Sequence, residues 1–315
     1  MNRVAITPRS FRGVSGEHLE LLRSSGIEAH FPDHERTLRE DEMVDFVRGC
    51  RALIVGVDPV PEMVLAAGPL QLVVKYGSGL DNVDVAAAER RGVRVVATPG
   101  TNSRSVAELA VALMFALARH LVPHHQGMTD GTRRRITGIE LADRRLGVIG
   151  YGNVGRQVAA LAGCLGLRVV AHDPFTSVRD ACAVGLDEAL ASDIVSLHMP
   201  YDPSTHHFID GAAMTAMPEG SLLINTSRPP IVDAAALAEA LDSGHLGGAA
   251  FDDLGDDAVL NAHLLASGRF LATPHCGAAT VEAVQRTALA TVRALIEHRD
   301  VWREGVDDEP ARQER

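Results

Sequence analysis

Residues 147–158 read "GVIGYGNVGRQV", in which an apolar run is followed by Gly150, Gly152 and Gly155 and then by a helical pattern. In this GxGxxG spacing the first glycine makes a tight turn after a strand, and the second lets the backbone approach a pyrophosphate. The third glycine permits close packing of the helix on the strand, and the free N–H groups at the helix start face the anion. Glycines that serve only a crowded turn are the competing interpretation. The order of strand, glycines and helix favours a dinucleotide site.

An acidic residue ends the next strand-like run. The run "LRVVAHD" closes on Asp173, 18 residues after Gly155. A carboxylate at this strand end can hydrogen-bond the adenosine ribose hydroxyls of NAD, and it would repel the ribose phosphate of NADP. Arg179 lies nearby in the sequence and opposes that preference. We therefore expect NAD as the cofactor.

Short β-branched runs alternate with helical patterns on both sides of this stretch, as in parallel α/β sheets. The runs before residue 99 are "RVAIT", "ALIVG", "LQLVVKYG" and "VRVVATP", and those after it include "DIVSLHMP", "SLLINTS", "GGAAFDD" and "RFLATPH". Residues 103–122 predict one long buried helix, and residues 280–298 predict a final amphipathic helix. We expect an α/β fold with two doubly wound parallel-sheet domains, at residues 1–98 and 99–278.

The composition excludes several classes of protein. The chain has 315 residues, a formal net charge of −11 and 46% hydrophobic residues, which is typical of a globular protein of two domains. A negative charge of this size argues against nucleic-acid binding, which relies on a basic surface. No signal peptide or membrane span is evident in the sequence. We therefore expect no nucleic-acid partner and no membrane partner.

The cysteines and histidines indicate neither a disulfide framework nor a metal site. The four cysteines lie far apart, at Cys50, Cys164, Cys182 and Cys276. This scatter suits a reducing cytoplasm better than zinc or disulfides, so we expect a cytoplasmic protein without a metal. Histidine pairs occur at residues 124–125 and 206–207, but adjacent side chains diverge and no carboxylate completes a ligand set.

Polar residues with catalytic potential follow the later strand-like runs. They are Arg228, the acidic run Asp252, Asp253, Asp256 and Asp257, and His275 in "TPHCG". Parallel strands place their ligands at their carboxyl ends, so these residues are candidates for one site. Taken singly, His275 could be a core histidine and Arg228 part of a surface ion pair.

Together with the glycine motif, these segments resemble the D-2-hydroxyacid dehydrogenase family, which includes phosphoglycerate dehydrogenases and glyoxylate and hydroxypyruvate reductases. The segments that carry the resemblance are "KYGSGLDNVD", "TPGTNSRSVAEL", "GVIGYGNVG", "LHMP", "NTSRPPIVD" and "ATPHCGAAT". The resemblance covers nearly the whole chain and corresponds to the short form without a regulatory domain. It implies a flavodoxin-like substrate domain at residues 1–98 and 279–315, a Rossmann NAD-binding domain at residues 99–278, and a homodimer.

The resemblance also implies roles for individual residues. His275 would be the general acid that protonates a substrate carbonyl as hydride arrives, and Arg228 would hold the substrate carboxylate. The remaining substrate-binding candidates are Lys75, Tyr76, Ser78 and Gly79, where backbone N–H groups of Ser78 and Gly79 would receive the carboxylate. The cofactor-binding candidates are Gly150, Gly152, Asn153, Val154, Gly155, Asp173, His198, Pro200 and Thr226.

Two departures from the family pattern affect these roles. The family usually has a glutamate, followed by proline, that orients the histidine. Counting forward from Asp252 places this glutamate at Asp257, whereas counting back from His275 places it at Asp256. Ala258 stands in the place of the proline. Aspartate is one methylene shorter than glutamate, so unless the backbone shifts, the hydrogen bond to His275 would be lost or bridged by water. The second departure is Pro229, which follows Arg228 directly and pushes it toward an extended conformation.

Lys75 is the only lysine, since 29 of the 30 basic residues are arginine. It ends a strand-like run beside the "GSG" loop, where an ammonium could meet a phosphate, phosphonate or second carboxylate of the substrate; a lysine retained by chance is the alternative. We interpret the chain as an NAD-dependent reductase or dehydrogenase of a small 2-keto or 2-hydroxy acid. One alternative is an NAD(H)-sensing protein similar to the family's corepressors, with little turnover. A methyltransferase on a related sheet would leave Arg228 and His275 without roles.

Overall fold

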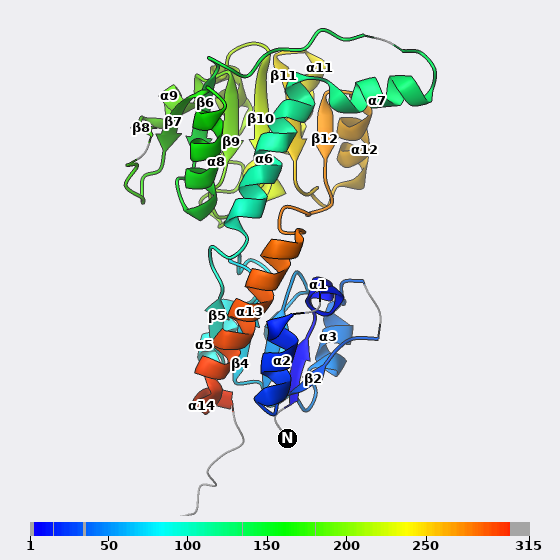
Figure 1. Ribbon diagram of the computed structural model, residues 1–315, viewed down its shortest axis with the longest axis vertical. Helices are drawn as coiled ribbons and strands as arrows, with labels where there is room; N and C mark the ends of the chain where they lie inside the picture. The colour runs from blue at the N-terminus through cyan, green and yellow to red at the C-terminus, as the bar shows by residue number, and fades with distance from the viewer. Residues whose placement is uncertain (1–2, 15, 34–35, 134, 180, 303–315) are drawn as a thin grey trace, which may run out of the picture. The chain divides into compact units, whose positions relative to one another are not determined.

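The computed structural model describes residues 3–302 except residues 15, 34–35, 134 and 180 (Figure 1). The chain forms two compact units, one from the described residues up to Thr101 together with those from Val281 onward, and one from Asn102–Thr280. The boundaries fall three residues after the predicted position 98 and two after the predicted position 278. Both units are α/β structures with parallel sheets, which confirms the predicted fold class.

The first unit has a five-stranded sheet in the order β2-β1-β3-β4-β5, all parallel, which is the flavodoxin-like order. The strands are β1 (Arg3–Ile6), β2 (Glu28–His30), β3 (Ala52–Val55), β4 (Leu72–Lys75) and β5 (Arg94–Ala97). The helices are α1 (Arg9–Gly13), α2 (Glu17–Ser24), α3 (Glu40–Phe46), α4 (Glu62–Ala66), α5 (Val85–Arg90), α13 (Val281–Glu297) and α14 (Arg299–Trp302).

Alternate residues of the first sheet face two separate cores. Leu53 and Val73 lie in one core with residues of α3, α4 and α5, whereas Ile54 and Val74 lie in the other. The second core includes Val292 and other apolar residues of α13. The predicted final helix therefore completes the first unit, although its sequence is separated from that unit by the whole of the second.

The second unit has a seven-stranded parallel sheet in the order β12-β11-β10-β9-β6-β7-β8. The strands are β6 (Arg145–Ile149), β7 (Arg168–His172), β8 (Cys182–Ala183), β9 (Ile194–Leu197), β10 (Ser221–Asn225), β11 (Leu246–Phe251) and β12 (Phe270–Ala272). The helices are α6 (Ser103–Ala118), α7 (Leu121–Thr129), α8 (Asn153–Cys164), α9 (Leu186–Leu190), α10 (Gly211–Ala216), the 3₁₀ turn η1 (Pro229–Ile231), α11 (Ala234–Asp242) and α12 (Ala258–Ala266).

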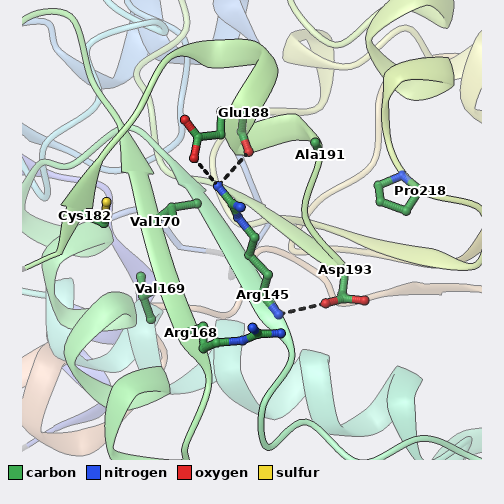
Figure 2. Close-up of a pocket in the computed structure, with 9 residues that line it drawn as sticks. All are labelled: Arg145, Arg168, Val169, Val170, Cys182, Glu188, Ala191, Asp193 and Pro218. Atoms are coloured by element: carbon green, nitrogen blue, oxygen red, sulfur yellow. Dashed lines mark hydrogen bonds and ion pairs between the residues drawn. The ribbon is translucent and has the colours of Figure 1, made fainter.

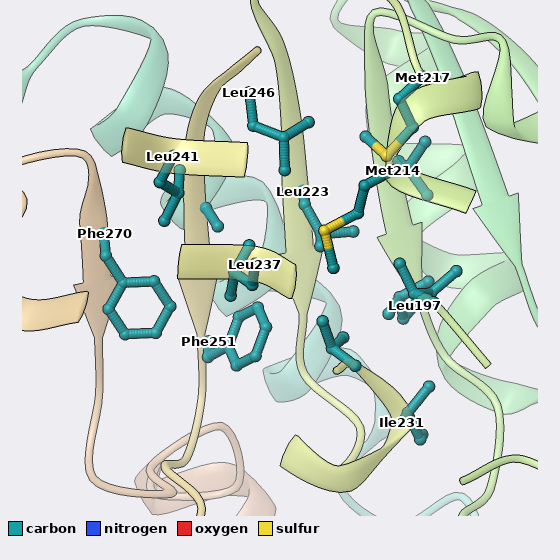
Figure 3. Close-up of a cluster of buried hydrophobic side chains, with 14 of the residues drawn as sticks. Leu197, Met214, Met217, Leu223, Ile231, Leu237, Leu241, Leu246, Phe251 and Phe270 are labelled. Carbon is teal, nitrogen blue, oxygen red and sulfur yellow. The ribbon is translucent and has the colours of Figure 1, made fainter. Parts of the chain in front are cut away.

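The second sheet is also covered on both faces. Figure 3 shows one core, in which Leu223 of β10 and Phe251 of β11 pack against Leu237 of α11. Leu222 and Ile224 point to the opposite core, which contains residues of α6 and α8. This alternation explains why the strands read as continuous apolar runs, since both faces of each central strand are buried.

The long helix predicted at residues 103–122 is interrupted in the structure. α6 ends at Ala118, His120 adopts a left-handed conformation with φ of 48°, and α7 begins at Leu121. Among the described residues no single helix is long and apolar enough to cross a membrane, although α6 and α7, bent by 62°, pass that test as a pair. Much of α6 lies in the core of the second unit.

Candidate active site

The glycine motif lies where the strand order of the second sheet reverses. β6 is flanked by β7 on one side and β9 on the other, so the carboxyl ends of β6 and β9 border a crevice where doubly wound folds bind ligands. Gly150 follows β6 with φ of 89°, and a Cβ there would lie 2.6 Å from the backbone carbon of His198, after β9. A Cβ on Gly155 would lie 2.0 Å from the oxygen of Gly150. Both positions therefore require glycine for packing.

Gly152 differs from the other two glycines. No atom lies within 4 Å of a Cβ built there, and its φ of −75° and ψ of −153° are open to other residues. The first residues of α8, Asn153 and Val154, follow at once, so the helix amino terminus opens onto this space. The space left by Gly152 fits the approach of a pyrophosphate, and it has no other explanation in the packing.

The Asp173 carboxylate holds the glycine turn in place. Oδ2 accepts a hydrogen bond from the N–H of Tyr151 at 2.7 Å, and Oδ1 accepts from Phe175 at 2.8 Å and Thr176 at 2.9 Å. Burial alone would raise the pKa of Asp173, but these backbone donors lower it from its ordinary value. The carboxylate keeps acceptor capacity beyond the three bonds, so it can also accept from a ribose hydroxyl.

His198 joins the ends of two neighbouring strands. Its Nε2 lies 2.8 Å from Oγ of Ser196, and its Nδ1 lies 3.3 Å from Oγ1 of Thr226, after β10. Burial lowers the pKa of His198 to about 3, so the ring stays neutral at physiological pH. Pro200 follows on the same loop and is exposed. These cofactor-binding candidates thus lie at one edge of the sheet.

The catalytic candidates follow the next three neighbouring strands. Arg228 lies after β10, in an extended conformation with φ of −132° and ψ of 141°, as Pro229 was expected to impose. Pro229 begins the 3₁₀ turn η1. Asn225 donates to the carbonyl oxygen of Arg228 at 2.9 Å, and its own side-chain oxygen accepts from the N–H of Ser227 at 2.9 Å. The loop that carries the guanidinium is therefore fixed at its base.

Asp252 anchors the loop that carries His275. The residue is 5% exposed, and its carboxylate accepts from the hydroxyl of Thr273 at 2.6 Å, from the N–H of Cys276 at 2.8 Å and from that of Gly277 at 2.7 Å. A carboxylate bound by three donors on both sides of His275 fixes the loop after β12 to the end of β11. His275 itself has φ of 51°, a left-handed conformation that is uncommon outside glycine.

The imidazole of His275 is paired with Asp253, whereas the two candidates for the position of the family's glutamate were Asp256 and Asp257. Nδ1 of His275 lies 2.9 Å from Oδ2 of Asp253, the second residue after β11. Asp257 instead caps α12, where it accepts from Val259 at 3.0 Å and Leu260 at 2.9 Å. The sequence carried a signal for this cap, because an aspartate before an apolar helical run is a typical N-cap.

In the first unit, Lys75 is buried at the end of β4. It is 5% exposed, and its Nζ donates to the carbonyl oxygen of Gly56 and to Oδ1 of Asn82, both at 2.5 Å. Asn82 also donates to the oxygens of Gly56 and Asp58. Lys75 thus ties the loop after β3 to the loop after β4, which contains the exposed Ser78 and the half-buried Gly79.

Tyr76 joins β4 to two helices of the same unit. Its hydroxyl donates to the carbonyl oxygen of Val284 in α13 at 3.1 Å, and Ser10 of α1 donates to that hydroxyl at 3.5 Å. Burial raises the pKa of Tyr76. Both the ring and the hydroxyl are therefore part of the packing around the end of β4.

A hollow of about 520 Å³ lies at the opposite edge of the second sheet (Figure 2). Arg145 at the start of β6 pairs with Glu188 at 2.7 Å, and its backbone N–H donates to Asp193 at 2.8 Å. The lining residues are at the amino ends of the strands, whereas the glycine motif, Arg228 and His275 are at the carboxyl ends. The hollow is therefore not the candidate active site. In the described part of the chain, no three histidine, cysteine, aspartate or glutamate residues are grouped as a metal site.

Residues 111–277 match the model of the "D-isomer specific 2-hydroxyacid dehydrogenase, NAD binding domain" family. The chain is 34% identical to hydroxypyruvate reductase of Thermotoga maritima over 268 residues, 82% of this chain and 88% of that relative. It is 40% identical to (S)-sulfolactate dehydrogenase of Chromohalobacter salexigens over 257 residues, 78% of this chain and 83% of that relative. The solved structure of the TT0316 protein of Thermus thermophilus is similar, with a TM-score of 0.84 and 33% identity over 93% of this chain and 96% of that chain.

The chain spans about half the length of some relatives. It covers 48% of the D-3-phosphoglycerate dehydrogenase of Mycobacterium tuberculosis, at 37% identity over 256 residues. The segments "GVIGYGNVG" and "ATPHCGAAT" both fall within or at the end of the matched family region.

Proposed function

The chain belongs to the D-isomer specific 2-hydroxyacid dehydrogenase family and is an NAD-dependent dehydrogenase or 2-keto acid reductase, and from this premise we propose that Arg228 and His275 act directly on its substrate. The observation that carries the proposal is the order of side chains along the carboxyl ends of the strands. Arg228, Asp253 and His275 follow the neighbouring strands β10, β11 and β12, and the glycine turn follows β6 at the same edge.

The proposed chemistry assigns one task to each side chain. Bound NADH supplies the hydride that adds to the keto carbon. The His275 imidazolium gives its Nε2 proton to the carbonyl oxygen and becomes neutral, because Nδ1 is already engaged with Asp253. Arg228 holds the substrate carboxylate through its two parallel N–H groups and polarises the carbonyl. In the reverse direction neutral His275 removes the hydroxyl proton.

The first unit is proposed to contribute the loop after β4. In this proposal backbone N–H groups of Ser78 and Gly79 receive the substrate carboxylate. Tyr76 fixes the end of β4, just before this loop, through its hydrogen bond to Val284. Because the Lys75 ammonium is buried between Gly56 and Asn82, it favours a role in holding this loop in shape. Its positive charge still contributes to the potential at the loop, since a buried charge is weakly screened.

We further propose that the substrate carries a second anionic group besides its carboxylate. The names of two relatives, sulfolactate dehydrogenase and phosphoglycerate dehydrogenase, support this, because sulfolactate and phosphoglycerate both carry such a group. The test is NADH oxidation by the purified protein with plain 2-keto acids, such as pyruvate and glyoxylate, against phosphorylated, sulfonated and dicarboxylic ones. A higher kcat/KM for the dianionic acids supports the proposal. Turnover of the plain acids alone would contradict the proposal of a second anionic group. Turnover of none of the acids would contradict the proposed reaction.

A homodimer is also proposed. Leu121 is 52% exposed, Val122 40% and Met128 62%, so α7 presents apolar side chains to solvent. Exposed apolar patches of this kind often mark interfaces between proteins. Light scattering should give twice the chain mass for the wild type and the single mass for a Leu121→Glu, Met128→Glu double variant. A monomeric wild type would contradict the proposal.

The NAD(H)-sensing alternative loses one of its two supports. That alternative depends on two departures from the family pattern, Pro229 and the altered acidic partner of His275, and Asp253 provides such a partner. We therefore do not propose it as a second function.

A further inference from the structure

We propose that Asp253 is the positioning residue of His275, so that in this chain the orienting carboxylate lies just after β11 and not next to the start of α12. This inference rests on the proposed function and deepens it, since the family pattern places the acid at Asp256 or Asp257. The carboxylate lies on the residue directly after Asp252, which anchors the loop of His275. Two adjacent aspartates thus divide the work, because one fixes the loop and the other orients the ring.

The hydrogen bonds of Asp253 fix the orientation and the tautomer of the His275 ring. Its Oδ1 accepts from the N–H of Leu254 at 2.8 Å, which fixes the carboxylate, and its Oδ2 lies 2.9 Å from Nδ1 of His275. An ionised carboxylate only accepts, so Nδ1 carries the proton and Nε2 is the nitrogen left for the substrate. The side chains of Asp253 and His275 are each 38% exposed, so the ring is partly accessible from solvent.

Asp253 remains ionised beside His275 and Arg228. Burial would raise its pKa, but the hydrogen bond to His275, the N–H of Leu254 and the charge of Arg228 lower it from its ordinary value. The carboxylate therefore interacts electrostatically with both residues that are proposed to act on the substrate. The other nearby acid, Asp252, is already bound by three donors of the His275 loop.

Asp257 is committed to another task. Its side chain accepts the N–H groups of Val259 and Leu260 at the start of α12, and it is exposed. Movement toward His275 would leave both helix donors without this acceptor. Ala258 in place of the family's proline agrees with this, because residue 258 is the first residue of a regular helix.

The experiment compares Asp253→Asn with Asp257→Asn, using the 2-keto acid on which the wild type is most active. The two oxygens of Asp253 accept from Leu254 and His275 separately, and Asp253→Asn replaces one of them with an NH2 group that cannot accept. Its neutral side chain also no longer stabilises the imidazolium. We expect kcat for reduction to fall about 100-fold. We also expect the alkaline limb of the pH profile to shift to lower pH. Because asparagine is as good an N-cap as aspartate, Asp257→Asn should stay within about threefold of the wild type in kcat, with an unchanged pH profile.

NADH affinity, measured by fluorescence titration, should be equal in all three proteins, which shows that the cofactor unit is folded. Asp253→Glu is the second variant, because it keeps the charge and should retain the alkaline limb of the wild type even if kcat falls. A loss of activity in Asp257→Asn with a wild-type Asp253→Asn would overturn the inference, and so would equal pH profiles for Asp253→Asn and wild type. Failure of the wild type on every 2-keto acid would count against the proposed function instead.

Discussion

Gly152→Ala and Gly155→Ala should affect different properties, NADH binding and stability, although the two glycines belong to one motif. Gly155 lies in α8 against the backbone of Gly150, and a Cβ there would meet the Gly150 oxygen at 2.0 Å. A Cβ on Gly152 would meet no atom within 4 Å. We therefore expect Gly155→Ala to destabilise the second unit, and Gly152→Ala to leave its stability unchanged and weaken NADH binding.

The magnitudes follow from these distances. An ordinary contact needs about 3.5 Å, so the methyl group of Gly155→Ala is about 1.5 Å too close to a backbone oxygen that cannot rotate away. This is at the upper end of overpacking, about 3 kcal/mol, which corresponds to a fall in Tm of about 6 to 12 °C. In Gly152→Ala the methyl group occupies the space proposed for the pyrophosphate. A steric cost of about 1 to 3 kcal/mol would weaken NADH binding by about 5-fold to 150-fold.

The assay is thermal unfolding of both variants without cofactor, together with fluorescence titration by NADH. Gly152→Ala should unfold with the wild type and bind NADH more weakly, whereas Gly155→Ala should unfold earlier. Wild-type NADH affinity in Gly152→Ala would refute the assignment of the pyrophosphate to this space. Wild-type stability in Gly155→Ala would refute the packing argument.

Three further predictions concern single side chains. Arg228→Lys should raise KM for 2-keto acids about 10-fold or more and leave NADH affinity unchanged, because an ammonium cannot make the paired hydrogen bonds of a guanidinium; an unchanged KM would contradict carboxylate binding there. Lys75→Arg should lower Tm, since the buried ammonium fits between Gly56 and Asn82 and a larger guanidinium overpacks the site by about 1 to 3 kcal/mol; a wild-type Tm would show that the lysine is interchangeable. The pKa of Asp173 is lowered in the fold, so its carboxylate should stabilise the fold fully above its unfolded pKa of about 3.9, and this effect should be lost as pH falls through that value toward the folded pKa. The difference in urea midpoint between wild type and Asp173→Asn should therefore shrink with falling pH. A constant difference would count against the three hydrogen bonds.

The sequence predicted the sheets well because their signal is local. The ten apolar runs all became strands, since burial on both faces leaves continuous β-branched segments. The two strands that were not predicted, β2 and β8, have three and two residues and lie at sheet edges. The break at His120 was also missed, because apolar residues continue from α6 into α7 and the turn contains neither glycine nor proline.

The partner of His275 could not be predicted by counting residues. Asp253 and His275 are 22 positions apart, and their contact depends on the pairing of β11 with β12 and on the loop that Asp252 holds. The family pattern pointed to Asp256 or Asp257, and the fold uses Asp257 as a helix cap. Lys75 shows the same limit, since its position at a strand end was visible, whereas its contact with Asn82 depends on how two loops meet.

The most direct test of the account is NADH oxidation with 2-keto acids by the wild type and by a His275→Gln variant, with NADH affinity measured for both. The account predicts equal NADH affinity and turnover of at least one 2-keto acid by the wild type, with a loss of about 100-fold to 10,000-fold in kcat for the variant. Comparable turnover by the variant would contradict the assignment of proton transfer to His275. NADH binding without turnover by the wild type would contradict the proposed reaction.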